Sequence, residues 1–275
     1  MSAMAPPDHK RFDEIKGKQQ KMWASGDYSA VAARIHPIAE RLVETADLVP
    51  GSRVLDVATG SGNAAIAAAR SDCEVIGIDY VPGLLDRARA RAAAEGLDID
   101  FAEADAEALP YADGSFDAVV SVVGVMFAPD QERAAAELVR VTRPGGKIAL
   151  ASWTPEGFIG DLLRVVVRYA PPPPGVRPAV EWGSRARLGE LLGSGVSRLD
   201  MEERIYTFRH RSAEEFADFF LVNYGPTERA AANLDDAGRE AMRKDLVALA
   251  EEKSVLPAGG PVAIPAAYLE AIAIR

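Results

Sequence analysis

Two glycines, Gly60 and Gly62, stand between a short apolar run and a helical pattern, in the sequence VLDVATGSGN of residues 54–63. Glycine lets the backbone turn sharply and approach a ligand closely. A helix that begins directly after such a loop presents unpaired backbone N–H groups, which favour a negatively charged or carboxylate-bearing group. The pattern therefore predicts a loop that binds part of a charged ligand.

Acidic side chains follow the next two apolar runs. Asp79 ends the run VIGID, where a carboxylate can accept hydrogen bonds from both ribose hydroxyls of a nucleoside. Asp105 follows the third run, where a carboxylate can accept a hydrogen bond from an adenine amino group. Together with the glycine loop, these acids predict a ligand that contains a nucleoside.

The elements that must position these residues are short apolar runs that alternate with alanine-rich helical segments. The runs are 53–58, 74–78, 99–102, 118–123 and 147–152, and the helical segments are 63–70, 82–95 and 130–142. Continuous apolar strands alternating with helices predict βαβ units and a parallel sheet that is covered on both faces. This part of the chain is therefore expected to form an α/β doubly wound sheet of at least five strands.

The pattern differs on either side of this region. Residues 29–48 show helical spacing, with Pro37 expected to kink or split the helix. After Trp153 the alternation stops, and strand-like patterns return only near 201–209 and 263–274. The intervening segments are expected to form a cap or an interface.

Composition limits the classes of function. The 275 residues carry 31 Lys+Arg and 41 Asp+Glu, a formal charge of 31 − 41 = −10. This argues against a generic nucleic-acid binder, which needs clustered Lys and Arg to neutralise phosphates. The first residues contain no apolar segment of a secretory signal, and no apolar run reaches the length of about 18 residues that spans a membrane. We therefore expect a cytoplasmic protein with no nucleic-acid partner and no membrane partner.

The metal-binding residue types are few and scattered. Cys73 is the single cysteine, which excludes an internal disulfide framework and a zinc site built from cysteines. His9, His36 and His210 lie far apart and show no ligand spacing, so we expect no metal. His36 is a weak candidate for a catalytic base, because it lies on the helical segment that enters the core.

Two ligands compete for the glycine loop. Gly60-x-Gly62-x-x-Ala65 fits the fingerprint of an NAD(P) site. Four features favour S-adenosylmethionine instead. They are Asp56 inside the first run, Asp105-Ala106 after the third, the acid-started run SFDAVVS (115–121) and the turn RPGGK (143–147).

The motifs VLDVATGSGN, GIDY, EADAEALPYADGSFDAVVS and RVTRPGGKI together resemble the class I S-adenosylmethionine-dependent methyltransferases. They are most similar to the methyltransferase type 11 branch, which includes the ubiquinone and menaquinone C-methyltransferases. The resemblance covers roughly residues 22–153.

The resemblance implies a Rossmann-like methyltransferase fold. Its sheet has seven strands, mostly parallel, with an antiparallel last strand, and helical insertions form a cap. The expected divisions are an N-terminal helical lid (1–45), a cofactor-binding core (46–153), a cap insertion (154–200) and the last two strands (201–275), which enclose a second helical cap insertion (211–258).

It also implies residue roles. Asp56, Ala58 and the loop Gly60, Ser61, Gly62 and Asn63 would hold the methionine portion of the cofactor, with Ser121 beneath it. Asp79 would bind the ribose with Tyr80 beside the adenosine, and Asp105 and Ala106 would bind the adenine. Trp23, Tyr28 and Arg34 would close over the site.

The function implied is methyl transfer from S-adenosylmethionine to a small-molecule acceptor through O, N or C, leaving S-adenosylhomocysteine. Proximity and desolvation would carry the reaction, and no catalytic residue is assigned beyond the weak candidate His36. Trp153, Trp182 and Tyr224 are candidates for the acceptor pocket. The alternatives are a quinone-type C-methyltransferase, an NAD(P)-dependent oxidoreductase and a non-catalytic cofactor-binding protein. Whether the protein forms a homodimer stays open.

Overall fold

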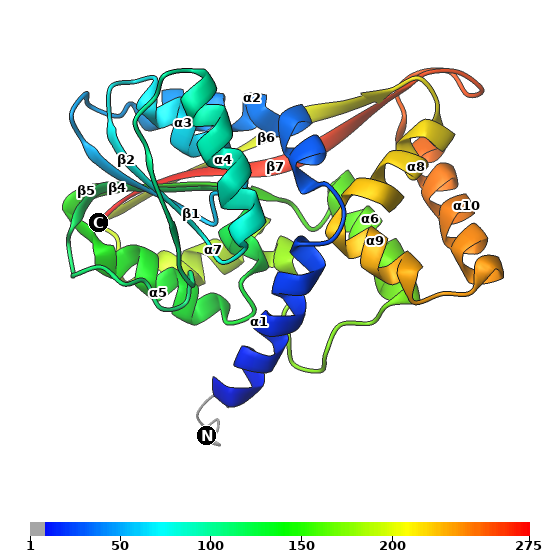
Figure 1. Cartoon of the computed structure of the whole chain (residues 1–275), viewed down its shortest axis with the longest axis horizontal. Coiled ribbons are helices and arrows are strands. Elements are labelled where there is room, and N and C mark those ends of the chain that lie inside the picture. The colour runs from blue at the N-terminus through cyan, green and yellow to red at the C-terminus, as the bar shows by residue number, and fades with distance from the viewer. Residues whose placement is uncertain (1–8) are drawn as a thin grey trace.

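A seven-stranded sheet forms the centre of the computed structural model, which describes residues 9–275 (Figure 1). The strands are β1 (Arg53–Val57), β2 (Glu74–Asp79), β3 (Asp100–Glu103), β4 (Phe116–Val122), β5 (Thr142–Trp153), β6 (Arg198–His210) and β7 (Val262–Ile274). Their order is β3-β2-β1-β4-β5-β7-β6, and β7 runs antiparallel to both of its neighbours. The predicted seven-stranded sheet with an antiparallel last strand is therefore confirmed.

Helices cover the sheet, and further helices lie beyond one end of it. They are α1 (His9–Trp23), α2 (Tyr28–Ala46), α3 (Asn63–Ala69), α4 (Pro82–Ala94), α5 (Gln131–Val141), α6 (Phe158–Tyr169), α7 (Arg185–Leu192), α8 (Ala213–Asn223), α9 (Gly225–Ala232) and α10 (Asp236–Lys253), with short 3₁₀ turns η1 (Val125–Phe127) and η2 (Ala179–Gly183). α2 and α3 pack together on one face of the sheet, and α5 and α7 pack together on the other (Figure 1). No helix in residues 9–275 is long and apolar enough to cross a bilayer.

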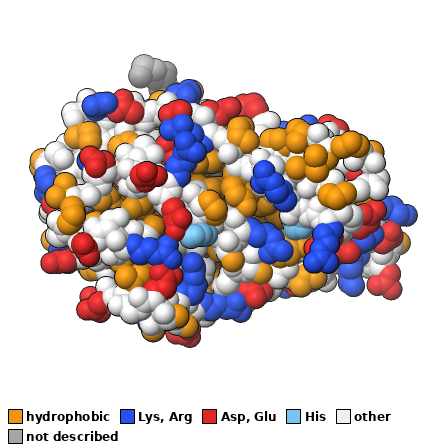
Figure 2. Space-filling model, turned by 90° about the horizontal axis from the view of Figure 1, so that it is seen from above, with side chains coloured by type: hydrophobic (Ala, Val, Ile, Leu, Met, Phe, Trp, Pro, Cys, Tyr) orange, Lys and Arg blue, Asp and Glu red, His pale blue; other side chains and the backbone are white. Residues whose placement is uncertain are grey.

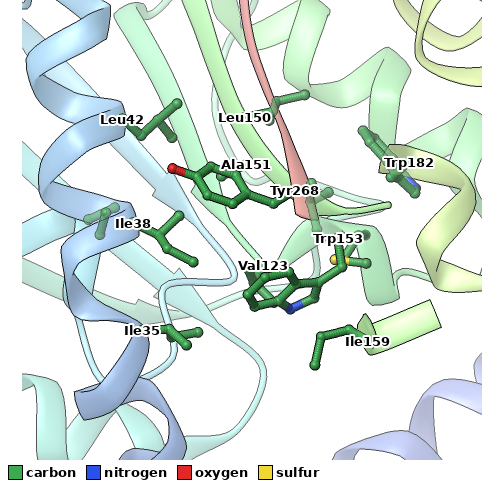
Figure 3. Packing of buried hydrophobic residues seen from close by; sticks show 14 of the residues in the cluster. Ile35, Ile38, Leu42, Val123, Leu150, Ala151, Trp153, Ile159, Trp182 and Tyr268 are labelled. Atoms are coloured by element: carbon green, nitrogen blue, oxygen red, sulfur yellow. The ribbon is translucent and has the colours of Figure 1, made fainter. Parts of the chain in front are cut away.

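The core lies between the sheet and these helices. Ile35, Ile38 and Leu42 on α2 point toward the sheet, where Val123 follows β4 and Trp153 ends β5 (Figure 3). α2 continues through Pro37 as one helix, so the expected split does not occur. Because its buried residues recur at helical spacing on both sides of the proline, packing against the sheet holds the two halves together.

The segments between the last strands form most of a second group of helices. α10 contacts α6, α8 and α9, and α9 also contacts α1, whose C-terminal residues Met22 and Trp23 lie against Gly225 (Figure 1). α7 lies instead beside α5, against the sheet. The division of the chain into lid, core and caps stays a prediction.

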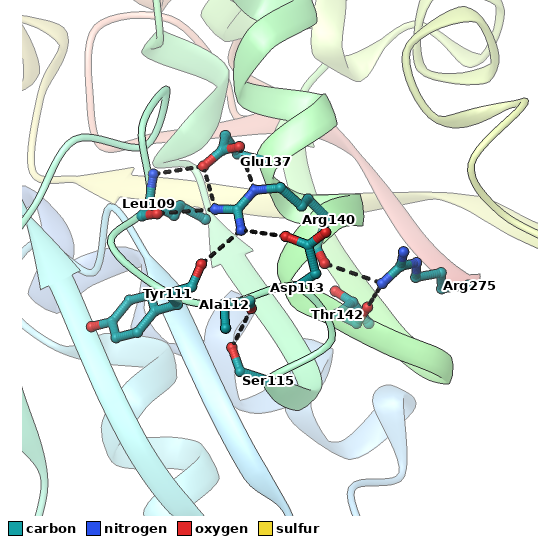
Figure 4. A network of polar contacts seen from close by, with 9 residues as sticks. All are labelled: Leu109, Tyr111, Ala112, Asp113, Ser115, Glu137, Arg140, Thr142 and Arg275. Atoms are coloured by element: carbon teal, nitrogen blue, oxygen red, sulfur yellow. Dashed lines mark hydrogen bonds and ion pairs between the residues drawn. The ribbon is translucent and has the colours of Figure 1, made fainter.

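A polar network fixes the segment that leads from β3 into β4. Arg140 on α5 donates to the carbonyl oxygens of Leu109 and Tyr111 and pairs with Glu137 and Asp113 (Figure 4). The hydrogen bonds from Arg140 hold the pKa of Glu137 below its usual range. The loop that follows Asp105 is thereby attached to the frame of the sheet.

Candidate functional site

A cavity of about 930 Å³, including its opening to solvent, lies at the carboxyl ends of β1, β2 and β4 and beneath α1 and α2. Most residues predicted from the sequence to hold a cofactor line it. These are Trp23, Tyr28, Asp56, Ala58, Gly60, Ser61, Asn63, Asp79, Tyr80, Asp105 and Ala106.

Asp56 supports the loop after β1 through hydrogen bonds. Its Oδ2 accepts hydrogen bonds from the Thr59 hydroxyl at 2.6 Å and from the backbone N–H of Ala65 at 2.8 Å. Burial raises the pKa of Asp56 to about 7 despite these donors. Asp56 thus both shapes the glycine loop and places a carboxyl group at the floor of the cavity.

Asp79 joins the ends of β1 and β2. Its Oδ2 accepts from the backbone N–H of Gly60 at 2.9 Å, and its Oδ1 accepts from that of Val81 at 2.9 Å. A carboxylate has about four lone-pair positions, so each oxygen can still accept a hydrogen bond from a ligand. Burial raises the pKa of Asp79 to about 6.

Gly60 leaves the space beside Asp79 open. It adopts a positive φ of 56°, which disfavours a side chain, and an added Cβ would lie 3.7 Å from the ring of Tyr28. Gly62 also has a positive φ, of 86°, but it lies behind the loop, where an added Cβ would come within 3.2 Å of Ala88. Gly60 therefore opens the cavity, while Gly62 permits close packing behind it.

Asp105 is held by a lysine that the sequence analysis did not identify. Lys16 on α1 lies 2.6 Å from Asp105 Oδ2 and 3.0 Å from Glu107 Oε2, and Glu107 is itself buried. Burial lowers the pKa of Lys16, but hydrogen bonds with these two carboxylates raise it more, so the net value lies above the usual one. The ammonium therefore stays charged and ties α1 to the loop after β3.

α1 crosses the cavity through one stripe of its surface. Lys16, Gln19, Gln20 and Trp23 occupy one face, since residues three and four apart are neighbours on a helix. Gln19 Nε2 donates to the carbonyl oxygen of Phe127 at 3.3 Å, and Gln20 Nε2 donates to that of Tyr80. Lys16 and Gln19 were missed from sequence, although this spacing in a polar helix is a signal that could have found them.

Aromatic rings close the end of the cavity next to Trp23. The Trp23 ring meets Phe127, Tyr28 and Tyr224 edge to face, with centroids 4.8, 5.3 and 5.8 Å away. Such edge-to-face contacts are favourable for aromatic pairs. Tyr224 supports Trp23 from behind and does not itself line the cavity.

The end of β4 meets the end of β1 in a strained, close-packed contact. Val123 and Ala58 have positive φ values of 53° and 54°, which is rare for side chains of their type. Ser121 lies beneath the cavity wall, where its hydroxyl donates to the carbonyl oxygen of Val57 at 2.7 Å and accepts from the N–H of Val125 at 3.0 Å. Ser121 therefore ties the two loops together, and its neighbours 122–125 line the cavity.

The remaining predicted residues lie outside the cavity. Arg34 is exposed and stacks on Phe219 at 3.6 Å, and His36 pairs with Glu40 at 3.3 Å on the outer side of α2. Trp153 and Trp182 are buried in the core, where large rings fill volume between sheet and helices. No histidine in the described part of the chain lines the cavity.

Comparison with known proteins agrees with this geometry. Residues 55–150 match the family model described as "Methyltransferase domain". The chain is 45% identical over 225 residues to an uncharacterized protein of Mycobacterium tuberculosis, covering 81% of this chain and 82% of that one.

The chain is also 39% identical over 165 residues to the demethylmenaquinone methyltransferase of Deinococcus radiodurans, covering 58% of this chain and 68% of that one. The crystal structure of a putative methyltransferase from Bacillus halodurans shares the fold, with a TM-score of 0.61 and 20% identity over 86% of this chain and 97% of that one. On these matches and the sheet order, the chain belongs to the class I S-adenosylmethionine-dependent methyltransferases.

Proposed function

We propose that this enzyme transfers a methyl group from S-adenosylmethionine to a small-molecule acceptor in the cavity beneath α1. The observation that carries the proposal is the buried carboxylate of Asp79, which holds the Gly60 loop and still has free lone pairs beside an open cavity. The residues fit the cofactor because Asp79 suits ribose hydroxyls and Asp105 suits an adenine amino group. Asp56 also lines the cavity, and its carboxyl group suits the methionine ammonium.

When bound, the cofactor supplies a methyl group on a sulfonium, which is open to in-line displacement. The protein contributes placement, and holding two reactants in line can contribute about 7–11 kcal/mol. Trp23 and Tyr28 exclude water from the end of the cavity. Burial raises the pKa values of Tyr28 and Tyr80, so neither phenol is suited to act as a base near neutral pH.

A quinone-type C-methyltransferase is the second candidate. The 39% identical relative from Deinococcus radiodurans is a demethylmenaquinone methyltransferase, and the end of the cavity near Trp23 is largely apolar.

The surface charge favours a small acceptor over a nucleic acid. Acidic and basic side chains are interspersed over the face shown in Figure 2, and the chain carries a net charge of −10. A cytoplasmic location and a homodimer stay predictions.

The proposal is tested by incubating the protein with methyl-labelled S-adenosylmethionine and metabolite extracts. We expect label to move into a compound of low molecular mass and S-adenosylhomocysteine to accumulate in proportion. Label appearing only in nucleic acid or protein would contradict a small-molecule acceptor.

We expect binding of S-adenosylhomocysteine to depend on pH through Asp79. Burial raises the pKa of Asp79 from 3.8 to about 6. Between these two pH values the folded, ligand-free protein therefore keeps the Asp79 carboxyl protonated, whereas the unfolded chain has it ionised. The ligand-free fold therefore loses stability as pH rises from about 4 to 7. Ribose hydroxyls need the ionised acceptor, and the buried carboxyl of Asp56, whose pKa is raised to about 7, ionises over the same range. The dissociation constant should therefore be at least tenfold larger at pH 5 than at pH 8. Calorimetric titration across this range checks the slope, and a flat profile would contradict the role.

We also expect α1 to be protected by the ligand. α1 covers the cavity through the contacts of Lys16, Gln19 and Trp23, so a ligand cannot enter by this side until these contacts open. Amide hydrogen exchange in residues 12–23 should slow when S-adenosylhomocysteine is added, while exchange in α10 stays constant. Equal protection of α1 with and without ligand would show that it is not a lid.

A further inference from the structure

The C-terminal end of α1 is fixed by close packing. Gly26, in the loop to α2, lies against the end of α8, where an added Cβ would come within 2.8 Å of the carbonyl oxygen of Val222. Gly225 at the start of α9 lies equally close to α1, since an added Cβ there would be 2.7 Å from the carbonyl oxygen of Met22. The ring of Trp23 is buried among its aromatic neighbours. This end of α1 therefore cannot move without disturbing the helices packed against it.

The N-terminal half of α1 is held mainly by polar contacts. It projects away from the sheet (Figure 1), and among the side chains of residues 12–22 Ile15 alone is buried. Lys16 joins this half to the loop after β3 through Asp105 at 2.6 Å and Glu107 at 3.0 Å. Water can replace contacts of this kind, and segments with few buried apolar contacts open most readily. We therefore expect α1 to open at this half rather than at its C-terminal end.

A second pocket lies on the outer side of Lys16, and we call it the outer pocket. It shares four lining residues with the main cavity, which are Lys16, Tyr80, Ala104 and Asp105. The contact between Lys16 and Asp105 thus lies at the boundary between the main cavity and the outer pocket. Breaking this contact would join the two spaces at the end of the cavity proposed for the adenine.

The charges of the outer pocket suit the incoming methyl donor. Asp13 and Glu103 line it together with Asp105, and Lys16 is the single cation among the described residues that do so. S-adenosylmethionine carries a sulfonium and an ammonium against one carboxylate, so it is a cation and is attracted to an acidic entrance. S-adenosylhomocysteine has lost the sulfonium charge and leaves without that attraction.

We propose that the cofactor enters and leaves between the N-terminal half of α1 and the loop after β3, and that Lys16 controls the rate of this exchange. α1 pivots about its packed end near Trp23, and the contacts of Lys16 with Asp105 and Glu107 form the latch. The inference rests on the proposed function, because it takes the main cavity for the cofactor. It makes Lys16 a residue that sets the rate of product release, a step that limits turnover in many enzymes.

The test measures how fast S-adenosylhomocysteine leaves and binds. A chase of the labelled compound with an unlabelled excess gives the dissociation rate, calorimetry gives the dissociation constant, and their ratio gives the association rate. In Lys16→Met we expect both rates to rise at least fivefold while the dissociation constant changes less than threefold, because the latch holds α1 both with and without ligand. Unchanged rates would overturn the proposal. Faster dissociation without faster association would also overturn it, since Lys16 would then act as a ligand contact.

Further variants of Lys16 separate its charge from its packing. Lys16→Gln keeps a hydrogen-bond donor without the charge and should accelerate both rates as Lys16→Met does. Lys16→Arg keeps a cation and should retain the rates of the unaltered protein within twofold. Lys18→Met is the matched control and should also retain them, because Lys18 is exposed on the same helix and lines neither space.

A variant at the other end of α1 tests the competing route. Tyr224→Leu loosens the packing behind Trp23 without removing a residue that lines the cavity, and it should leave both rates within twofold. If Tyr224→Leu accelerates exchange and Lys16→Met does not, the cofactor passes through the aromatic end and the proposal is wrong.

Binding of S-adenosylhomocysteine to the unaltered protein is measured first. If it does not bind, the proposed function fails and the inference falls with it. If it binds and its rates do not respond to Lys16→Met, only the inference fails.

Discussion

Asp79→Ala is expected to weaken binding of S-adenosylhomocysteine by about 100-fold or more. The variant loses the charged acceptor for two ribose hydroxyls, and hydrogen bonds to charged groups contribute about 1.5–3 kcal/mol each. It also leaves the N–H groups of Gly60 and Val81 without their partner, so the glycine loop loses its support. Isothermal titration calorimetry on the folded variant measures the change.

Asp86→Ala is the matched control for this experiment. Asp86 lies on α4, is exposed and pairs with Arg89 at 2.9 Å on the surface. Its removal should leave the affinity unchanged, because exposed ion pairs contribute little. An Asp79 variant that is folded and binds as tightly as the Asp86 variant would contradict the ribose-binding role.

Gly124→Ala is expected to damage both stability and ligand binding. An added Cβ would lie 2.5 Å from the carbonyl oxygen of Ala58 and 2.9 Å from its Cβ, and the backbone of that loop cannot move without shifting the floor of the cavity. Overpacking of this kind costs about 1–3 kcal/mol. We therefore expect a lower melting temperature and at least tenfold weaker binding of S-adenosylhomocysteine.

Gly83→Ala provides the comparison for the same chemical change. Gly83 lies in the first turn of α4, and an added Cβ would meet nothing within 4 Å. Alanine favours a helix over glycine, so this variant should be as stable as the parent or slightly more so. If Gly124→Ala matches Gly83→Ala in melting temperature and ligand affinity, the close contact between the two loops is not essential.

The parts of the site built on the sheet could be predicted from sequence. Asp56 lies near the end of β1, Gly60 follows β1 and Asp79 ends β2. These strands have continuous apolar patterns, and parallel strands bring their carboxyl ends to one edge. The order of elements and the antiparallel strand β7 followed from the resemblance of the motifs. The structure confirms the sheet, while the contacts of these residues with a cofactor stay predictions.

The contributions of α1 could not be predicted because they depend on how a polar helix docks. Lys16 reaches Asp105 across 89 positions of sequence, and Gln19 reaches Phe127 across 108. Their spacing from Trp23 places them on one face of the helix, but the spacing alone does not show what that face contacts. Their role appears only when the helix lies across the cavity.

Aromatic residues were also ambiguous in sequence. Trp23 lines the cavity, whereas Trp182 is fully buried in the core, and both occur in segments without a motif. A large ring can fill a core or face a ligand with the same local pattern. Arg34 was predicted to close over the site, but it is exposed. Its guanidinium stacks on the ring of Phe219 on the outer surface.

The cavity is expected to bind the methyl-donor cofactor through Asp79. Titration of S-adenosylhomocysteine, and of NADPH in parallel, into the unaltered protein and Asp79→Ala tests it most directly. We expect one site for S-adenosylhomocysteine in the unaltered protein, its loss or strong weakening in Asp79→Ala, and no binding of NADPH. Binding of NADPH without binding of S-adenosylhomocysteine would contradict it.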